Sequence, residues 1–176
     1  MDDHDWVAVV AAERCGECGL TASAVGTAQL AGMFAGEGEA WARLLTGTDP
    51  AVLRRRTDPD VWSALEYGAH ARDVLAVFTE RIGRSLAEAE PTFGWWDHDA
   101  AVVEERYNEQ DPHVVASAIA ARATAMGAVL DTVEGPAWLR TGTRRDGEVF
   151  SVAGLARFAL HEVHHHRIDA SAAVAG

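Results

Sequence analysis

The chain has 176 residues, which is the size of one ordinary domain with a core of its own. Hydrophobic residues make up 48% of it and charged residues 24%, a composition that excludes a disordered or collagen-like chain. The formal net charge of −12 disfavours nucleic acid as a partner, because such surfaces need cationic contacts to phosphates. An acidic start and the lack of a long uninterrupted apolar run predict a cytoplasmic protein with no membrane partner.

The first half of the chain predicts two long helices. Apolar residues near helical spacing predict a helix over residues 21–45. Asp49-Pro50 and Asp58-Pro59 each place a capping carboxylate before a proline at the first helical position. These pairs predict a short turn over residues 50–55 and a second helix from Asp60 to about Ala89.

The second half predicts two more helices. Residues 92–110 show no sustained period and indicate a long connection. Asp111-Pro112 repeats the cap signature and opens a third helix, and Asp146-Gly147 predicts a small hairpin within residues 138–150. A fourth helix follows over 151–172. Four helices with almost no strand signal predict an all-α four-helix bundle over 21–176, preceded by a segment, 1–20, that contains Cys-x2-Cys.

Histidines on the fourth helix are the main chemical signal. His161 and His165 lie one helical turn apart, so both can bind one divalent metal. With Glu162 they match the zinc-protease signature, but the eleven residues after His165 leave no room for the downstream third ligand of such proteases. The third ligand is therefore expected upstream. Of the candidates, His70 is favoured because it lies mid-helix in an apolar-patterned element; the others are His4, His98 and His113.

Two further features can belong to a metal site. Glu66 lies one turn before His70 and can accept a hydrogen bond from a ligand or serve as a fourth ligand. Cys15 and Cys18 resemble half of a zinc knuckle, with glycines that permit the tight turn. His4, another side chain of the fold or a second copy of the chain would complete that site. Alternatively, the cysteines cycle between dithiol and disulfide.

Other residues have weaker signals. The run Trp95-Trp96-Asp97-His98 can line the mouth of a pocket, and Arg72 and Arg157 can bind a carboxylate substrate. A role in the packing of the fold explains each of these residues at least as well. A run of helical histidines is itself often a solvated face, which would leave the chain a bundle without a metal.

Three stretches, residues 62–74, 107–112 and 161–166, resemble the DinB/YfiT-like superfamily, and within it the N-terminal-domain type of the mycothiol-dependent maleylpyruvate isomerases. The resemblance implies an up-down-down-up four-helix bundle with a divalent metal, most often zinc or nickel, held by three histidines. Matched motif to motif, these are His70, His161 and His165. Some isomerase-type members have Glu at the position matched to His161.

The resemblance also implies a function. Characterised relatives are transferases and isomerases that act with low-molecular-weight thiols such as mycothiol. We therefore expect a metal-dependent enzyme that activates such a thiol for S-transfer or isomerisation of a small-molecule substrate. The expected macromolecular partner is a second copy of the chain in a homodimer. The alternative from another class is a non-catalytic metal-binding or stress-response bundle.

Overall fold

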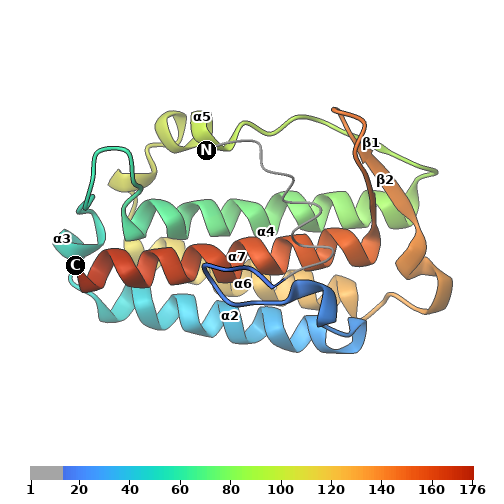
Figure 1. Ribbon diagram of the computed structural model, residues 1–176, viewed down its shortest axis with the longest axis horizontal. Coiled ribbons are helices and arrows are strands. Elements are labelled where there is room, and N and C mark those ends of the chain that lie inside the picture. The colour runs from blue at the N-terminus through green and yellow to red at the C-terminus, as the bar shows by residue number, and fades with distance from the viewer. Residues whose placement is uncertain (1–13) are drawn as a thin grey trace.

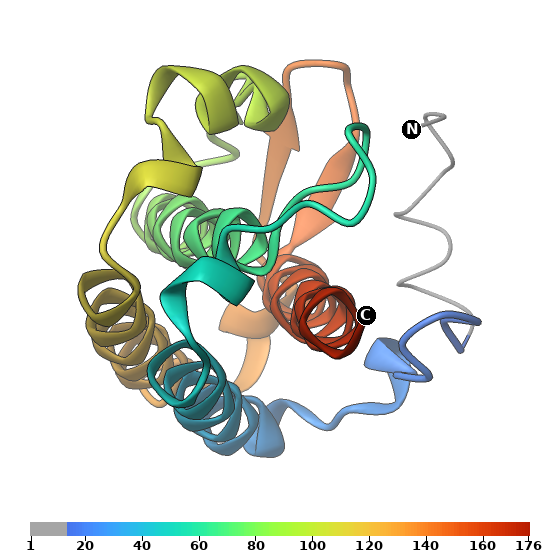
Figure 2. The same ribbon diagram turned by 90° about the vertical axis from the view of Figure 1, so that its left-hand side faces the viewer.

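Four long helices dominate the computed structural model, which describes residues 14–176. They are α2 (Thr27–Gly47), α4 (Ala64–Ala87), α6 (Pro112–Leu130) and α7 (Val152–Ala175). Figure 1 shows α4 and α6 running in one direction and α2 and α7 in the other, and Figure 2 shows the four helices end-on around one core. Because α2 and α4 each pack mainly against α6 and α7, they lie diagonally across the bundle. The predicted all-α, up-down-down-up bundle is confirmed.

Side-chain caps set the start of three helices. Asp49 accepts a hydrogen bond from the Ala51 amide at the start of the short helix α3 (Pro50–Leu53). Asp111 accepts one from the His113 amide, 2.8 Å away, at the start of α6. Ser151 caps α7 in the same way. These are the positions that the sequence predicts, because a short oxygen-bearing side chain satisfies amides that have no partner within the helix.

The predicted start of the second helix at Asp60 is wrong by one turn. Helix α4 begins at Ala64 because Ser63 and Glu66 form a capping box, in which Ser63 Oγ accepts from the Glu66 amide and Glu66 Oε2 accepts from the Ser63 amide at 2.7 Å. The preceding Asp58 instead closes a turn by accepting from the Asp60 amide.

The connection between α4 and α6 is more ordered than its sequence indicates. It contains β1 (Thr92–Phe93), α5 (His98–Glu104) and the 3-10 turn η2 (Tyr107–Glu109), and two further 3-10 turns, η1 (Ala22–Ala24) and η3 (Gly135–Leu139), lie elsewhere. The predicted hairpin is present as β2 (Thr141–Arg144) and β3 (Val149–Ser151), with Gly147 at φ +94° in the turn. Strand β1 pairs in parallel with β2, so the hairpin holds the start of the connection against one end of the bundle.

Helix α6 is long and apolar enough, by length and composition alone, to cross a membrane. In the structure it packs against both α2 and α4. Arg122 near its middle donates to the Arg72 carbonyl and to the Asp73 carboxylate of α4. In the structure α6 is therefore one of the four packed helices of the bundle.

Helix α2 approaches α6 closely at a buried glycine. A Cβ atom at Gly38 would lie 3.0 Å from Ala123 Cβ and 3.5 Å from Ala120 Cα, whereas one at the exposed Gly36 would meet nothing within 4 Å. Small residues therefore allow the two helix backbones to approach.

We expect Gly38→Val to lower the free energy of unfolding by about 1–3 kcal/mol, because the added methyl groups force α2 away from α6. The matched variant Gly36→Val should change it by less than about 0.5 kcal/mol. Urea denaturation of both variants measures the difference. Equal stabilities would contradict the close approach.

Candidate metal centre

Helix α7 presents polar side chains to three different neighbours. On the face toward α2, His164 Nδ1 lies 2.8 Å from Glu37 Oε1, and Arg167 Nε donates to Glu37 Oε2 at 2.7 Å. Burial raises the pKa of Glu37, but His164 and Arg167 outweigh it and hold the pKa below its ordinary value. The other two faces carry interleaved pairs with i, i+4 spacing: Glu162 and His166, and His161 and His165.

The first pair gathers around His70 of α4. His166 Nε2 lies 3.6 Å and His70 Nε2 lies 4.0 Å from the same oxygen, Glu162 Oε2. The three ligand atoms lie within 4.8 Å of one another, and both histidines are buried. Asp169, one turn further along α7, lies 3.1 Å from His166 Nδ1. A carboxylate there orients the imidazole and leaves its Nε2 lone pair for a metal.

Aromatic side chains surround these ligands. Trp96 stacks on His70 with ring centroids 5.4 Å apart and an interplanar angle of 6°. Trp62 packs on the same imidazole at 5.2 Å, and His98 lies 5.7 Å from it. Tyr67 stacks on His166 at 5.3 Å. Two residues of the run 95–98, which is predicted to line a pocket mouth, thus lie beside His70: Trp96 and His98.

Burial and charge act on these groups in opposite directions. Burial alone raises the pKa of Glu162, but the imidazoles of His161, His166 and His70 lower it well below its ordinary value. Burial lowers the pKa of His166, yet Asp169 and Glu162 outweigh it and raise the pKa to about 9. For His70, burial prevails and lowers the pKa to about 4. The group therefore offers a carboxylate and a neutral imidazole, the forms that bind metals.

The separations of the two imidazoles from Glu162 fit a shared metal ion. Bonds from zinc to nitrogen or oxygen are about 2.1 Å long, so two atoms on one ion lie at most about 4.2 Å apart. The separations of 3.6 and 4.0 Å fall within that limit. The buried Nδ1 of His70 has no hydrogen-bond partner among the described residues. Two imidazoles and a carboxylate are ligands that zinc and nickel accept.

The second pair of α7 faces the segment before α2. His161 and His165 form a group with Cys15 and Cys18, whose ligand atoms also lie within 4.8 Å of one another. Both cysteines are free. Burial raises the pKa of the Cys15 thiol, but hydrogen bonds from His161 and from backbone amides lower it to about 6, whereas burial and the nearby Cys15 raise the pKa of Cys18 to about 11.

The predicted ligands His70, His161 and His165 are thus distributed between two groups. His70 lies with Glu162 and His166, and His161 and His165 lie with the two cysteines. The three-histidine set remains a prediction from the family resemblance. Glu162 and His166 are also spaced i, i+4 and lie on the same stripe of the helix as apolar residues. This spacing is the sequence signal that would have indicated the set of His70, Glu162 and His166. Among the other candidates, His4 lies outside the described residues.

Glu66 does not contact His70 in the described part of the chain. Its carboxylate receives two hydrogen bonds from Arg56, at 2.6 and 2.9 Å, and one from the Ser63 amide. Burial raises the pKa of Glu66, but these contacts lower it overall. Arg56, from the segment before α4, thus holds this buried carboxylate at the start of the helix.

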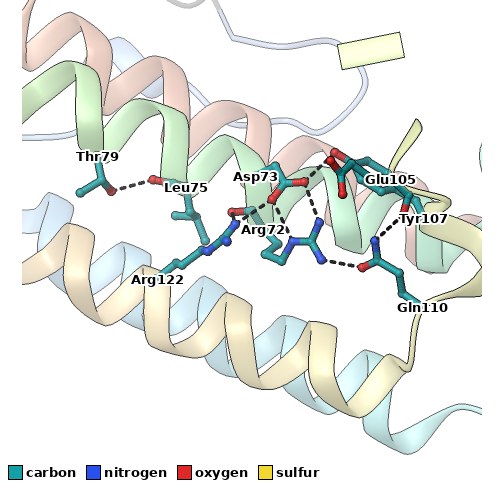
Figure 3. Close-up of polar contacts among 8 residues, drawn as sticks. All are labelled: Arg72, Asp73, Leu75, Thr79, Glu105, Tyr107, Gln110 and Arg122. Atoms are coloured by element: carbon teal, nitrogen blue, oxygen red, sulfur yellow. Dashed lines mark hydrogen bonds and ion pairs between the residues drawn. The ribbon is translucent and has the colours of Figure 1, made fainter. Parts of the chain in front are cut away.

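Arg72 and Arg157 also have structural partners. Arg157 donates to the Val25 carbonyl, and Arg72 donates two hydrogen bonds to Asp73. Figure 3 shows Asp73 enclosed by Arg72, Arg122 and Tyr107, whose hydroxyl lies 2.6 Å from Asp73 Oδ2. A hollow of about 750 Å³ adjoins this cluster and includes Trp96 in its lining. Trp96 is therefore common to the hollow and to the surroundings of His70.

Comparisons with known proteins agree with this architecture. The family model of the DinB superfamily matches residues 33–170, so the chain belongs to that superfamily. YfiT from Bacillus subtilis, described as a probable metal-dependent hydrolase with an unusual four-helix bundle topology, has a similar structure. Its TM-score is 0.77 at 16% identity, over 84% of this chain and 85% of that one. None of the curated proteins compared matches the chain.

The Asp73 cluster generates a pH prediction. Burial raises the pKa of Asp73, but Arg72, Tyr107 and Arg122 lower it below its ordinary value of about 3.9. A carboxylate with a lowered pKa stabilises the fold above its unfolded-state pKa and loses that contribution as the pH falls through its folded-state pKa. We expect Asp73→Asn to cost about 2 kcal/mol at pH 7, and the difference from wild type to shrink below about pH 4.

Urea denaturation of metal-free protein between neutral and acidic pH measures this difference. The exposed Asp131 provides a matched control, and Asp131→Asn should change the stability by less than about 0.5 kcal/mol. A cost of Asp73→Asn that persists unchanged in acid would contradict the electrostatic explanation.

Proposed function

We propose that this chain is a divalent-metal-dependent enzyme whose ion, zinc or nickel, is held by His70, Glu162 and His166. The observation that carries the proposal is the convergence of these three ligand atoms, from two helices, within 4.8 Å. Membership of the DinB superfamily and the description of YfiT as a probable metal-dependent hydrolase support it.

The number of protein ligands favours catalysis over a structural role. Catalytic zinc sites have three protein ligands and an open position, whereas structural sites are closed by four. Asp169, the next acidic group on α7, contacts the Nδ1 atom of His166 and so serves to orient that ligand. The exchangeable position is then available to a small molecule.

A divalent ion in such a site lowers the pKa of the thiol or water that it binds, so that a nucleophile is available at neutral pH. Trp62 and Trp96 cover His70 with apolar surface and limit the access of water to it. His98, whose side chain is 45% exposed, lies beside His70 and can accept the proton that the nucleophile loses.

We propose a low-molecular-weight thiol of the mycothiol type as the nucleophile, since the family resemblance points to it. Its sulfur would lose a proton to His98 and form a bond to an electrophilic carbon of a small-molecule substrate. In S-transfer a leaving group departs from that carbon with its bonding electrons. In isomerisation the sulfur adds to a carbon–carbon double bond and leaves again after rotation about that bond. Water is the competing nucleophile, favoured by the description of YfiT as a probable hydrolase.

The ligand set can be tested in the Cys15→Ser/Cys18→Ser background, which removes the cysteines as competing ligands. We expect His70→Ala, Glu162→Gln and His166→Ala each to weaken zinc binding at least about 100-fold, because each removes a direct ligand. Competition titration against a chromophoric chelator measures the affinity.

His164→Ala is the matched control, because His164 is on the same helix and contacts Glu37; it should bind zinc as the background protein does. Loss of binding with His161→Ala and His165→Ala, and not with Glu162→Gln and His166→Ala, would replace the proposed ligands by the three histidines of the family pattern.

The nucleophile can be tested with cobalt in the same cysteine-free background. Adding glutathione or mycothiol should produce a sulfur-to-cobalt charge-transfer band in the near ultraviolet, and His70→Ala should abolish it. No band with either thiol, but a spectral change with azide, would overturn the thiol in favour of water. No response to any of the three would overturn the open position and favour the non-catalytic bundle.

A further inference from the structure

The segment that precedes α2 makes a tight turn around two sulfur atoms. The Gly19 amide donates to the Cys15 carbonyl and the Cys15 amide donates to the Leu20 carbonyl, both at 2.9 Å. Gly19 has φ +76°, a backbone conformation that residues other than glycine rarely adopt. The backbone amides of Glu17 and Leu20 are directed at the sulfurs of Cys15 and Cys18, respectively. This turn places both sulfurs on the side that faces α7.

Two imidazoles of α7 meet these sulfurs. His165 Nδ1 lies 3.6 Å from Cys15 Sγ. The other nitrogen of the same ring, Nε2, lies 3.2 Å from Glu17 and 3.5 Å from Asp169. His161, one turn earlier, interacts with the Cys15 sulfur and has its Nδ1 3.6 Å from Glu162 Oε1. A carboxylate behind the imidazole is the usual support for a histidine that ligates zinc.

The distances match a tetrahedral ion. With bonds of about 2.3 Å to sulfur and about 2.1 Å to nitrogen, a tetrahedral zinc separates the two ligand atoms by about 3.6 Å. The Cys15 Sγ to His165 Nδ1 distance is 3.6 Å. All four ligand atoms lie within 4.8 Å of one another, and a donor set of two sulfurs and two imidazole nitrogens is typical of structural zinc.

We propose that Cys15, Cys18, His161 and His165 form a second, closed zinc site, which fastens the segment before α2 to the last helix. The site is separate from the proposed catalytic ion, because it uses the other i, i+4 pair of α7. Its four protein ligands leave no position for substrate.

A role in fastening fits the position of the segment. Figure 2 shows residues 14–26 running beside α7, outside the ring of four helices. Within this stretch the buried apolar side chains are small, namely Cys15, Ala22 and Val25, and the larger Leu20 is only half-buried against the core. Because such side chains bury little apolar area, the hydrophobic effect alone holds the segment weakly. A metal that joins it to α7 supplies the missing attachment.

The test uses untagged, fully reduced protein and cobalt as the probe. Wild type should bind two cobalt ions per chain, one of which shows a sulfur-to-cobalt charge-transfer band and the intense visible bands of tetrahedral cobalt. Cys15→Ser/Cys18→Ser should bind one ion and lose both features. His70→Ala should keep both features, because it removes only the proposed catalytic ion. His164→Ala serves as the folded control on α7.

Reduced wild type without a charge-transfer band would overturn the proposal and leave the cysteines as a dithiol pair. A band that survives His161→Ala and His165→Ala would also overturn it, since the sulfurs would then have other co-ligands. The charge-transfer band reports only the ion bound by the cysteines, and loss of the ion at His70 changes only the number of ions bound. The result for the cysteine site can therefore be interpreted even if no ion binds at His70.

A second measurement needs no variant and so does not depend on folding. Titration of zinc-loaded wild type with a mercurial thiol reagent should release one zinc per chain as both cysteines react, detected with a zinc-sensitive dye. The zinc at His70 should remain, because none of its ligands is a thiol. Reaction of both cysteines without zinc release would contradict the proposed site.

Discussion

A half-buried carboxylate, Glu162, links the two halves of this site. One oxygen lies 3.6 Å from His166 and 4.0 Å from His70, and the other lies 3.6 Å from His161. An ionised carboxylate away from water is costly unless cations or hydrogen-bond donors surround it. The imidazoles of His161, His166 and His70 surround it in the metal-free chain, and a divalent ion would supply positive charge in the loaded one. Helix α7, which carries Glu162, must therefore be held in one orientation about its axis, so that this carboxylate faces the imidazoles.

The rest of the bundle holds that rotation. Trp41 of α2 donates from Nε1 to the Val163 carbonyl at 3.0 Å, and Arg167 donates to Glu37 on the adjoining face. Each of these contacts comes from α2, which lies beside α7, while His70 approaches from α4 on another side. Because three directions around α7 have fixed partners, the polar pairs on it cannot exchange places without breaking buried contacts.

Periodicity and caps predicted the helices well, because these signals are local. Asp111 and Ser151 satisfy helix ends within three residues of themselves. The site was predicted less completely, because its decisive contacts join residues far apart in sequence. Nothing near Cys15 indicates that His165 is its neighbour. Nothing near His70 indicates that Trp96, from a connection that showed no period, stacks on it. The parallel pairing of β1 with β2 was missed for the same reason.

The two interleaved pairs on α7 have an evolutionary consequence. Successive residues of a helix are about 100° apart around its axis. The pair His161 and His165 is therefore related to the pair Glu162 and His166 by a rotation of about 100° about the axis of α7. Insertion of one residue between the hairpin and His161 would bring the pair His161 and His165 opposite His70. A lineage can thus change a carboxylate-containing ligand set into an all-histidine one without substituting any ligand, and aligned positions in distant members need not be equivalent in space.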